Sequence, residues 1–310
     1  MKARAELIED AGAAASSPEF FRSKEFLKAE RATHSLRIEC GTETLTAPLL
    51  IREIEGSDLV DGISPYGYPG FEVSGDSPAI DPEEIDFSGT GLVTVFVRHT
   101  LGGKPPLTGA TARNVCLLSD PALPRKSRPS DRRQVRRNAE SGYEVEIIDA
   151  GTAGAHERAG FFRAYTETMK RTDAATRYFF DEDYFNAIYA APATRIAIAR
   201  DNGGVVAAAS IATVSDGMLH YYLSGTADSN LRDSPMKNVL QALIELGEDL
   251  ELPLNLGGGI TAGDALEEFK RGFANREEQW FTSELICNKE AYEALSPAGS
   301  TDFFPAYRTP

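Results

Sequence analysis

Residues 217–259 read GMLHYYLSGTADSNLRDSPMKNVLQALIELGEDLELPLNLGGG, and they contain the clearest structural pattern in the chain. The first ten residues read as a strand, and the last seven form a short apolar strand that runs into three glycines. Between them lies an amphipathic helix over 235–250, whose apolar positions are 236, 239, 240, 243, 244 and 250. Pro235 suits its first turn and Ser234 suits its cap. The stretch therefore predicts a strand, a loop, a capped helix and a further strand.

The flanking sequence predicts further strands and helices, so we expect an α/β protein. An amphipathic helix is expected at 156–171, with Phe161, Phe162, Tyr165 and Met169 on one stripe. The other elements expected in the second half are strands at 194–200 and 204–215 around a DNGG turn, a short helix at 263–273 and a final strand at 278–287. Those expected in the first half are a helical lead-in (1–33), strands around a turn near Gly41 (35–54), a long loop (61–90), strands at 91–99 and 112–120, a helix capped by Ser130 that ends near Gly142, and a strand at 143–150.

The composition is that of a globular protein. A chain of 310 residues, 42% of them hydrophobic, predicts two domains or one large one. No apolar run approaches the roughly 18 to 20 residues of a membrane-spanning helix, and the N-terminus does not resemble a secretory signal. We therefore expect a cytoplasmic protein without membrane insertion. Three widely spaced cysteines and four scattered histidines argue against a disulfide framework and a metal site.

Charge is distributed unevenly along the chain. The net charge is −15, which argues against indiscriminate binding to nucleic acid, because phosphate is repelled overall. The stretch RKSRPSDRRQVRRN (125–138) is the exception, with seven basic residues against one aspartate. It is either a solvated linker and helix face or a binding surface for a polyanion. In the second case Arg132, Arg133, Arg136 and Arg137 are the candidate residues for binding that polyanion.

The order of elements is that of the GNAT-type acyltransferase fold, although a plain α/β domain has the same order. Six segments then follow one another as in the Fem (FemABX) family of aminoacyl-tRNA-dependent peptidyl transferases, which this chain resembles. They are RRQVRRNAESGYEV, FFRAYTETMKR, HYYLSGT, SPMKNVLQALIELG, LNLGGG and DALEEFKRGF. The resemblance covers residues 130 to 290 well and residues 35 to 130 loosely.

The resemblance implies an α/β fold of two GNAT-like lobes, with mixed, mainly antiparallel sheets flanked by helices and a cleft between the lobes. We expect the N-terminal lobe at residues 1–140 and the C-terminal acyltransferase lobe at 141–310, whose tail can return to the first lobe. It also implies aminoacyl-tRNA as co-substrate, which makes the four arginines of 125–138 named above candidates for binding tRNA. A small-molecule or carrier-bound peptide acceptor, and no cofactor, are implied as well. The chain is expected to act as a monomer.

The reaction itself needs few protein groups. An acceptor amine attacks the ester carbonyl of an aminoacyl-tRNA, and negative charge develops on the carbonyl oxygen, where a cation or hydrogen-bond donor must meet it. Because the ester is already activated, neither a protein nucleophile nor a metal is required, and positioning can supply much of the rate.

The resemblance assigns two catalytic candidates. Phe269 and Lys270 match the family's Phe-Lys dipeptide, in which the lysine stabilises the oxyanion or the terminal ribose-phosphate of the tRNA. Tyr221, in HYYLSGT, matches an aromatic donor that faces the cleft and can polarise the ester carbonyl. A surface lysine and a core tyrosine are the alternative interpretations. By strand alternation Tyr221 and Leu223 share one face, with His220 and Tyr222 on the other.

Substrate-binding candidates come from several segments. Phe269, Tyr222, and Lys237 in SPMKN are taken from the matching segments, and Gly257 and Gly258 let a backbone or ligand approach closely. Arg171, Arg177 and Tyr178, in MKRTDAATRY, are the nearest counterparts of family residues that bind a diphosphate-linked acceptor; a structural charge at the helix end is the alternative.

The segment SPYGYPG (64–70) holds Tyr66 and Tyr68 between prolines and glycines that restrain the backbone. These rings either cover a core or line the same cleft as Lys270, where an acceptor or the end of a tRNA would stack.

Two other functions remain open at this point. One is a GNAT-type N-acyltransferase that uses acyl-CoA, and the other is a non-catalytic binding module. The loop GTADSNLRDSPMKN (225–238) argues against the first, because it has no glycine after Gly225, it contains Asp228 and Asp233, and Pro235 lacks an N–H donor. The acceptor classes expected for a Fem-like enzyme are a cell-wall precursor and a peptide or nucleoside of secondary metabolism.

Overall fold

The computed structural model describes residues 3–14, 19–75, 79–259, 261, 263–297 and 303–309, and the chain divides into two compact units. Unit 1 comprises Met1–Arg113 and Gln279–Pro310, and unit 2 comprises Asn114–Glu278. The division lies about 27 residues before the boundary expected near residue 140, because β9 and α2 belong to unit 2, where β9 pairs with β14 and β15 and α2 contacts α5.

Unit 1 is built on a mixed sheet. Its described strands are β1 (Ala3–Ile8), β2 (His34–Cys40), β3 (Glu43–Glu53), β4 (Val60–Ile63), β5 (Glu72–Ser74), β6 (Ile85–Gly89), β7 (Leu92–Arg98), β8 (Thr111–Ala112) and β16 (Phe281–Ile286). They follow the order β6-β1-β2-β3-β4-β7-β16-β8, with β5 paired to β3. The pairs β1–β6 and β4–β7 are parallel and the other pairs are antiparallel. Unit 1 also contains the helices α1 (Lys24–Ala29) and α7 (Lys289–Leu295).

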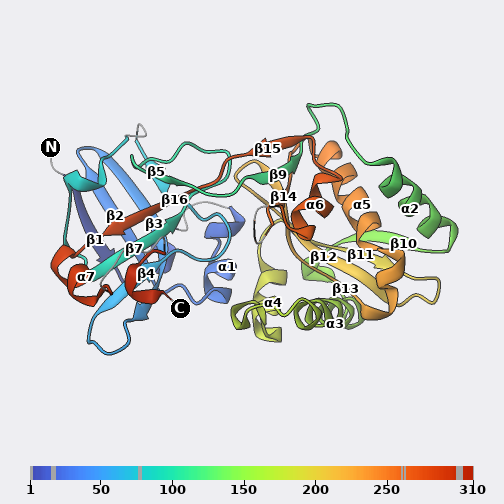
Figure 1. Cartoon of the computed structure of the whole chain (residues 1–310), viewed down its shortest axis with the longest axis horizontal. Helices are drawn as coiled ribbons and strands as arrows, with labels where there is room; N and C mark the ends of the chain where they lie inside the picture. Colours follow the sequence, from blue (N-terminus) through green and yellow to red (C-terminus); the bar gives the residue numbers. More distant parts are fainter. Residues whose placement is uncertain are drawn as a thin grey trace. The chain divides into compact units, whose positions relative to one another are not determined.

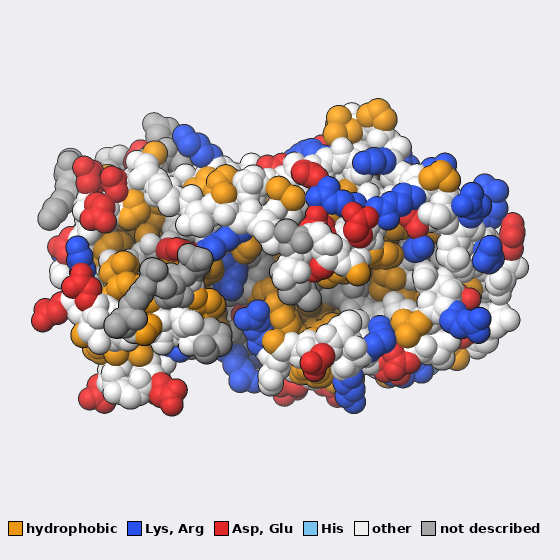
Figure 2. Space-filling model, in the orientation of Figure 1, with side chains coloured by type: hydrophobic (Ala, Val, Ile, Leu, Met, Phe, Trp, Pro, Cys, Tyr) orange, Lys and Arg blue, Asp and Glu red, His pale blue; other side chains and the backbone are white. Residues whose placement is uncertain are grey.

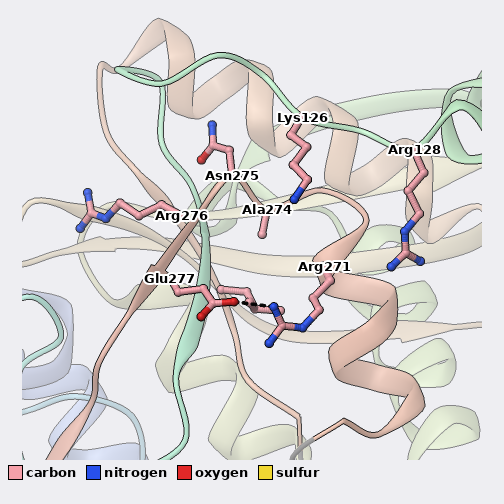
Figure 3. Close-up of a pocket in the computed structure, with 8 residues that line it drawn as sticks. Lys126, Arg128, Arg271, Ala274, Asn275, Arg276 and Glu277 are labelled. Atoms are coloured by element: carbon pink, nitrogen blue, oxygen red, sulfur yellow. Dashed lines mark hydrogen bonds and ion pairs between the residues drawn. The ribbon is translucent and has the colours of Figure 1, made fainter.

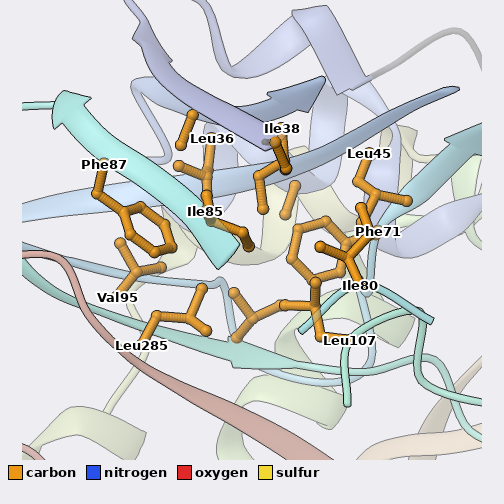
Figure 4. Close-up of a cluster of buried hydrophobic side chains, with 14 of the residues drawn as sticks. Leu36, Ile38, Leu45, Phe71, Ile80, Ile85, Phe87, Val95, Leu107 and Leu285 are labelled. Atoms are coloured by element: carbon orange, nitrogen blue, oxygen red, sulfur yellow. The ribbon is translucent and has the colours of Figure 1, made fainter. Parts of the chain in front are cut away.

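The core of unit 1 forms between two parts of this sheet. Figure 4 shows apolar side chains of β2, β3 and β6 facing those of β7 and β16. Leu285 of β16 is 1% exposed, so a strand that follows unit 2 in the sequence completes this core.

Unit 2 is a second mixed sheet with helices on both sides. Its described strands are β9 (Cys116–Ser119), β10 (Glu144–Asp149), β11 (Thr194–Arg200), β12 (Val206–Ser215), β13 (Met218–Thr226), β14 (Leu254–Gly257) and β15 (Arg276–Glu278), in the order β10-β11-β12-β13-β14-β9-β15. Only β13–β14 is parallel, over two residue pairs, so both sheets are mixed and mainly antiparallel, as predicted.

The helices of unit 2 cover opposite faces of its sheet, as Figure 1 shows. Helix α5 (Met236–Asp249) packs on one face with a core that includes Val239, Leu240 and Leu243. Helices α3 (Ala155–Arg171) and α4 (Glu182–Ala190) pack on the other face. Helix α2 (Pro129–Glu140) lies against α5, and the short helix α6 (Ala265–Arg271) follows β14.

Several elements differ from the sequence-based expectation. The lead-in contains the strand β1, because Ala3 and Ala5 are buried in the core and the segment pairs with β2 and β6. The expected loop at 61–90 contributes β4, β5 and β6 to the sheet. The final strand at 278–287 is two strands in different units, β15 and β16.

Two caps and one helix also differ. Helix α2 starts at Pro129, and Arg128 rather than Ser130 is its N-cap. Ser234 adopts a left-handed backbone conformation (φ 48°) and Pro235 is the N-cap of α5. Helix α4 was not expected from the sequence; Asp181 caps it by accepting a hydrogen bond from the Tyr184 N–H.

Candidate active site

The Lys270 side chain lies at the glycine turn that ends β14. Asp264 caps α6 by accepting a hydrogen bond from the Glu267 N–H at 2.7 Å, and Lys270 is on the buried side of this helix, 8% exposed. Its Nζ donates a hydrogen bond of 2.7 Å to the carbonyl oxygen of Gly258. Gly257 has φ +73°, and a Cβ there would lie 3.2 Å from Lys270 Nζ. The glycine turn therefore leaves space for the ammonium group.

Burial controls the charge state of this lysine. Desolvation lowers the pKa of Lys270 to about 8, although the nearby Cys116 and Asp264 act in the opposite direction. Most molecules still carry the ammonium at neutral pH, in surroundings where a charge acts strongly. An ammonium group has three N–H donors, and the bond to Gly258 uses one of them. The remaining donors can meet an oxygen that gains negative charge.

A buried polar network holds the glycine turn in place. Asn255 accepts a hydrogen bond from the Gly257 N–H at 2.8 Å through Oδ1, and its Nδ2 contacts His220 Nδ1 at 3.1 Å. His220 Nε2 lies 3.2 Å from the carbonyl oxygen of Ser215, which can only accept. Nε2 therefore donates to Ser215, and Nδ1 accepts from Asn255. Burial lowers the pKa of His220 to about 4, which keeps the ring neutral.

Sequence reasoning missed His220 and Asn255 as residues of this site. Both are polar and buried, 3% and 2% exposed, on otherwise apolar strands next to LGGG. A polar residue at a buried strand position needs a partner, and this is the signal in the sequence that could have identified them.

Tyr221 lies on β13 beside a β-bulge. Its hydroxyl is hydrogen-bonded to the Ser224 hydroxyl, and burial raises the pKa of Tyr221 to about 12. Tyr221 is paired with Ala212, whereas Leu223 is paired with Ile211, so Tyr222 is the additional residue of the bulge. Ile211 and Ala212 are consecutive and point to opposite faces, so Tyr221 and Leu223 do not share a face. The expectation from simple alternation was wrong because it could not include a bulge.

The side chains of Tyr221 and Tyr222 lie on different faces of the unit 2 sheet. Tyr221 packs on the core beneath α5, together with Phe269, whose ring lies 5.8 Å from that of Phe273. The Tyr222 hydroxyl is hydrogen-bonded at 2.7 Å to the hydroxyl of Tyr184 on α4. Tyr184 in turn is stacked on Phe180, with ring centroids 3.9 Å apart.

Three further charged candidates have partners within unit 2. Lys237 forms an ion pair of 2.8 Å with Asp131, which connects α5 to α2. Arg171 pairs with Asp228 in the segment after β13. The Arg177 guanidinium lies 5.0 Å from the ring centroid of Tyr178 and is exposed.

The tyrosines of SPYGYPG belong to unit 1. Gly67 has φ +87°, and a Cβ there would lie 2.3 Å from the Phe21 ring, so only glycine fits. The Tyr68 ring makes edge contacts with Phe21 and Trp280, at 5.6 and 5.9 Å between centroids. Tyr66 is 38% exposed, and its N–H donates to the Glu30 carboxylate. Tyr68 thus packs in an aromatic cluster, whereas Tyr66 lies at the surface.

Unit 2 also contains a pocket of about 280 Å³, and half of the residues that line it are basic. Figure 3 shows Lys126 and Arg128 pointing from one segment toward Arg271 at the end of α6. Arg271 is paired with Glu267 and Glu277. The pocket is lined by Leu117, Lys126, Arg128, Arg271, Ala274, Asn275, Arg276 and Glu277.

Over the described parts of the chain there is neither a helix long and apolar enough to span a bilayer nor a group of three or more His, Cys, Asp or Glu side chains suited to a metal ion.

The chain has the same fold as several solved structures. FemX superposes with a TM-score of 0.61 over 93% of this chain and 97% of that chain, at 10% identity. The C-terminal domain of a putative lysylphosphatidylglycerol synthetase from Agrobacterium fabrum gives 0.59 over 91% and 92%, at 12% identity. L-PGS from Bacillus licheniformis gives 0.53 over 80% and 82%, at 12% identity.

Sequence comparison adds a narrower match. Residues 125–271 match the family model of the acetyltransferase (GNAT) domain, and no curated protein sequence matches the chain. This segment contains β10 to β13, α5, the glycine turn and Lys270. Residues 125–271 of unit 2 therefore resemble an acetyltransferase domain of the GNAT type. The fold expected from the resemblance to the Fem family, two mixed sheets flanked by helices, is confirmed.

Proposed function

We propose that this protein is an aminoacyltransferase that forms an amide bond between an amino acid carried on tRNA and an acceptor amine. The observation that carries the proposal is the buried Lys270 ammonium at the glycine turn of β14, inside a GNAT acyltransferase domain. The fold shared with FemX supports a Fem-like rather than a simple acetyl transfer.

In the proposed reaction the acceptor nitrogen attacks the carbonyl carbon of the aminoacyl ester. The carbon–oxygen bond to the ribose then breaks, and a proton lost by the amine ends on the ribose oxygen. Lys270 stabilises the negative carbonyl oxygen of the intermediate, and the Tyr221 hydroxyl, which stays protonated because burial raises its pKa to about 12, acts as a second donor. Asn255 and His220 are positioning residues, since they hold the Gly257 backbone beside Lys270.

The segment between β13 and α5 supports a donor other than coenzyme A. A pyrophosphate at a helix N-terminus needs free backbone N–H groups. Here the N–H groups of Lys237 and Asn238 donate to the carbonyl oxygens of Ser234 and Pro235 at 3.0 Å. Asp228 and Asp233 add negative charge to the same segment.

The acceptor is proposed to be the amine of a peptide or nucleoside, either in a cell-wall precursor or in a secondary metabolite. Arg177 and Tyr178 suit a phosphorylated acceptor because their cation and ring lie together at the surface of unit 2. Tyr66, exposed in unit 1, is the candidate for stacking on a flat substrate group.

A GNAT-type N-acyltransferase that uses acyl-CoA is the second candidate, favoured by the match of residues 125–271 to an acetyltransferase domain. One experiment separates the two. The full chain is incubated with a panel of amine acceptors and either radiolabelled aminoacyl-tRNA or acetyl-CoA, with and without ribonuclease. Transfer that requires intact aminoacyl-tRNA and is lost in Lys270→Ala supports the proposal; transfer from acetyl-CoA alone overturns it.

A further inference from the structure

Four arginines form one exposed face of α2. Arg132, Arg133, Arg136 and Arg137 are all exposed, and at about 100° per residue they lie within one arc of the helix. Asp131 and Asn138, on the other side, are buried. We call the four arginines the α2 arginine face.

These arginines lack acidic partners among the residues that the structure describes. Arg132 is hydrogen-bonded to Ser127, and no ion pair joins any of the four to a carboxylate in the described ranges. By contrast, Arg125 and Arg128, just before α2, pair with Glu248 and Glu268. The spacing Arg132–Arg136 and Arg133–Arg137 makes two like-charged i,i+4 pairs, which destabilise a helix unless an anion compensates them.

The arginine face is held on a fixed support. Asn138 donates hydrogen bonds to Asn238 at 2.7 Å and to the carbonyl oxygen of Asp233 at 2.8 Å. The Lys237–Asp131 ion pair holds the first turn of α2. Because α2 is anchored to α5 from its buried side, binding on the exposed side costs little ordering of the backbone.

The arginine face continues into the basic pocket. Arg132 bonds to Ser127, which lies between Lys126 and Arg128, two residues that line the pocket. Lys126 has no ion-pair partner among the described residues, and the pair of Arg128 with Glu268 is about half exposed, so an incoming anion can replace it at little cost. Figure 2 shows Lys and Arg side chains gathered over α2 and the segment that leads into it.

We propose that the α2 arginine face and the adjoining pocket bind consecutive phosphates of an RNA backbone. Phosphodiesters suit the site because a row of fixed guanidinium groups offers paired N–H donors to each phosphate. On a chain with a net charge of −15, this local basic surface would also fix where the RNA docks. The identification of the RNA as the tRNA substrate rests on the proposed function, whereas the phosphate chemistry rests on the charges alone.

The test is direct binding of deacylated tRNA to the full chain, measured at 50 to 200 mM salt. The variant is Arg133→Glu/Arg136→Glu, whose side chains are exposed and have no described partner. The matched control is Lys24→Glu/Lys289→Glu, which makes the same change in net charge in the first turns of α1 and α7, where glutamate is well tolerated. Circular dichroism confirms that both proteins are folded.

We expect the arginine variant to weaken tRNA binding by about tenfold or more and to reduce the slope of log affinity against log salt by about 2, while the control retains both. Unchanged binding in the arginine variant, or equal weakening in the control, overturns the proposal. Competition by pyrophosphate as effective as by RNA, at equal phosphate concentration, assigns the site to small phosphate esters and also overturns it. If tRNA binding depends on the arginines but no aminoacyl transfer occurs, the proposed function is refuted and the RNA-binding surface stands. If the arginine variant transfers the amino acid with an unaltered KM for aminoacyl-tRNA, the RNA-binding surface is refuted and the proposed function stands.

Discussion

The Lys270 ammonium is bonded at 2.7 Å to the carbonyl oxygen of Gly258, twelve residues earlier, on the turn that its own helix follows. The contact closes a loop between β14 and α6 around a charged group that is 8% exposed. A carbonyl oxygen can satisfy only part of an ammonium group, and the desolvation of the remainder is a cost that folding must overcome.

Replacing Lys270 with methionine should separate activity from stability. A pKa lowered from 10.5 to about 8 corresponds to about 3 kcal/mol of unfavourable burial at neutral pH. Lys270→Met should therefore retain most or all of the wild-type stability to urea, while kcat for aminoacyl transfer falls about 100-fold or more.

Lys170→Met, a change at an exposed lysine of the same unit, is the control and should alter neither quantity. Wild-type turnover in Lys270→Met would remove the central residue of the proposed mechanism. The pH dependence of stability gives a second test. The pKa of Lys270 is about 8 in the folded protein and 10.5 in the unfolded chain, so the unfolded chain holds the Lys270 proton to higher pH. The destabilisation caused by burying the charged Lys270 is therefore complete below pH 8 and decreases as pH rises from 8 to 10.5.

Two buried histidines should make both units sensitive to mild acid. Burial lowers the pKa of His99 in unit 1 and of His220 in unit 2 to about 4, against 6.5 when unfolded. Their stabilising contribution is complete above pH 6.5 and is lost as pH falls toward 4, by about 2 kcal/mol per histidine between pH 7 and pH 5.

Trp280, the single tryptophan of the chain, lies in unit 1, so its fluorescence reports the unfolding of that unit. His99→Gln should flatten the pH dependence seen by this probe, whereas His156→Gln, at a side chain that is 67% exposed, should not. Equal slopes in all three proteins would refute this account of the acid sensitivity.

Gly257→Ala should lower both the stability of unit 2 and the rate of transfer. Gly257 and Gly204 have nearly the same φ, +73° and +75°, but a Cβ at Gly204 meets nothing within 4 Å, whereas at Gly257 it meets Lys270 Nζ at 3.2 Å. Both substitutions should destabilise unit 2 by about 1 kcal/mol through strain. Only Gly257→Ala should also lower kcat and shift the apparent pKa of Lys270, measured by the pH profile of transfer. Equal kinetics in the two variants would show that the ammonium does not depend on this close approach.

Tyr221→Phe should reduce kcat by about 10- to 100-fold, because it removes the proposed hydroxyl donor and keeps the ring against the core under α5. Ser224→Ala leaves the Tyr221 hydroxyl in place and removes only its partner, so its effect should be smaller. The ratio of kcat values should stay constant from pH 6 to pH 9, since the pKa of Tyr221 is raised to about 12. If Tyr221→Phe changed only KM, a binding role would replace the proposed donor role.

The Lys237–Asp131 pair should be a structural connection between α5 and α2. Lys237→Met leaves the Asp131 carboxylate, 9% exposed, without its ion pair and should destabilise unit 2 by about 2 kcal/mol. The double variant Asp131→Asn/Lys237→Met should lose less than the sum of the two single variants. Additive losses, measured by urea unfolding followed by circular dichroism, would contradict this coupling.

The elements of unit 2 could largely be predicted from the sequence because their signals are local. The apolar stripe of α5, the DNGG turn between β11 and β12 and the glycines after β14 each specify their own conformation. In unit 1 the strands depend on contacts between segments that are distant in the sequence. The sequence of β1 favours a helix, but pairing with β2 and β6 makes it a strand, and β4 and β5 are strands because they pair with β3.

The same distinction applies to the candidate site. The family dipeptide and the glycine turn pointed to Lys270, and the structure brings these two features into contact. The β-bulge at Tyr222 and the partners of His220 depend on the register between strands, which a single strand does not encode. The joint role of Tyr66 or Tyr68 with Lys270 stays a prediction.

Unit 2 is continuous in the chain, whereas β16 of unit 1 lies between β7 and β8 and is made after unit 2. On the ribosome, residues 1–113 cannot complete their sheet while residues 114–278 are synthesised. This takes on the order of ten seconds or more at about 5 to 20 residues per second. During this interval one edge of β7 has no neighbour, and an open apolar strand edge recruits other chains. Aggregation of nascent chains should therefore compete with folding until β16 emerges and pairs with β7, and a chaperone that shields β7 would raise the yield.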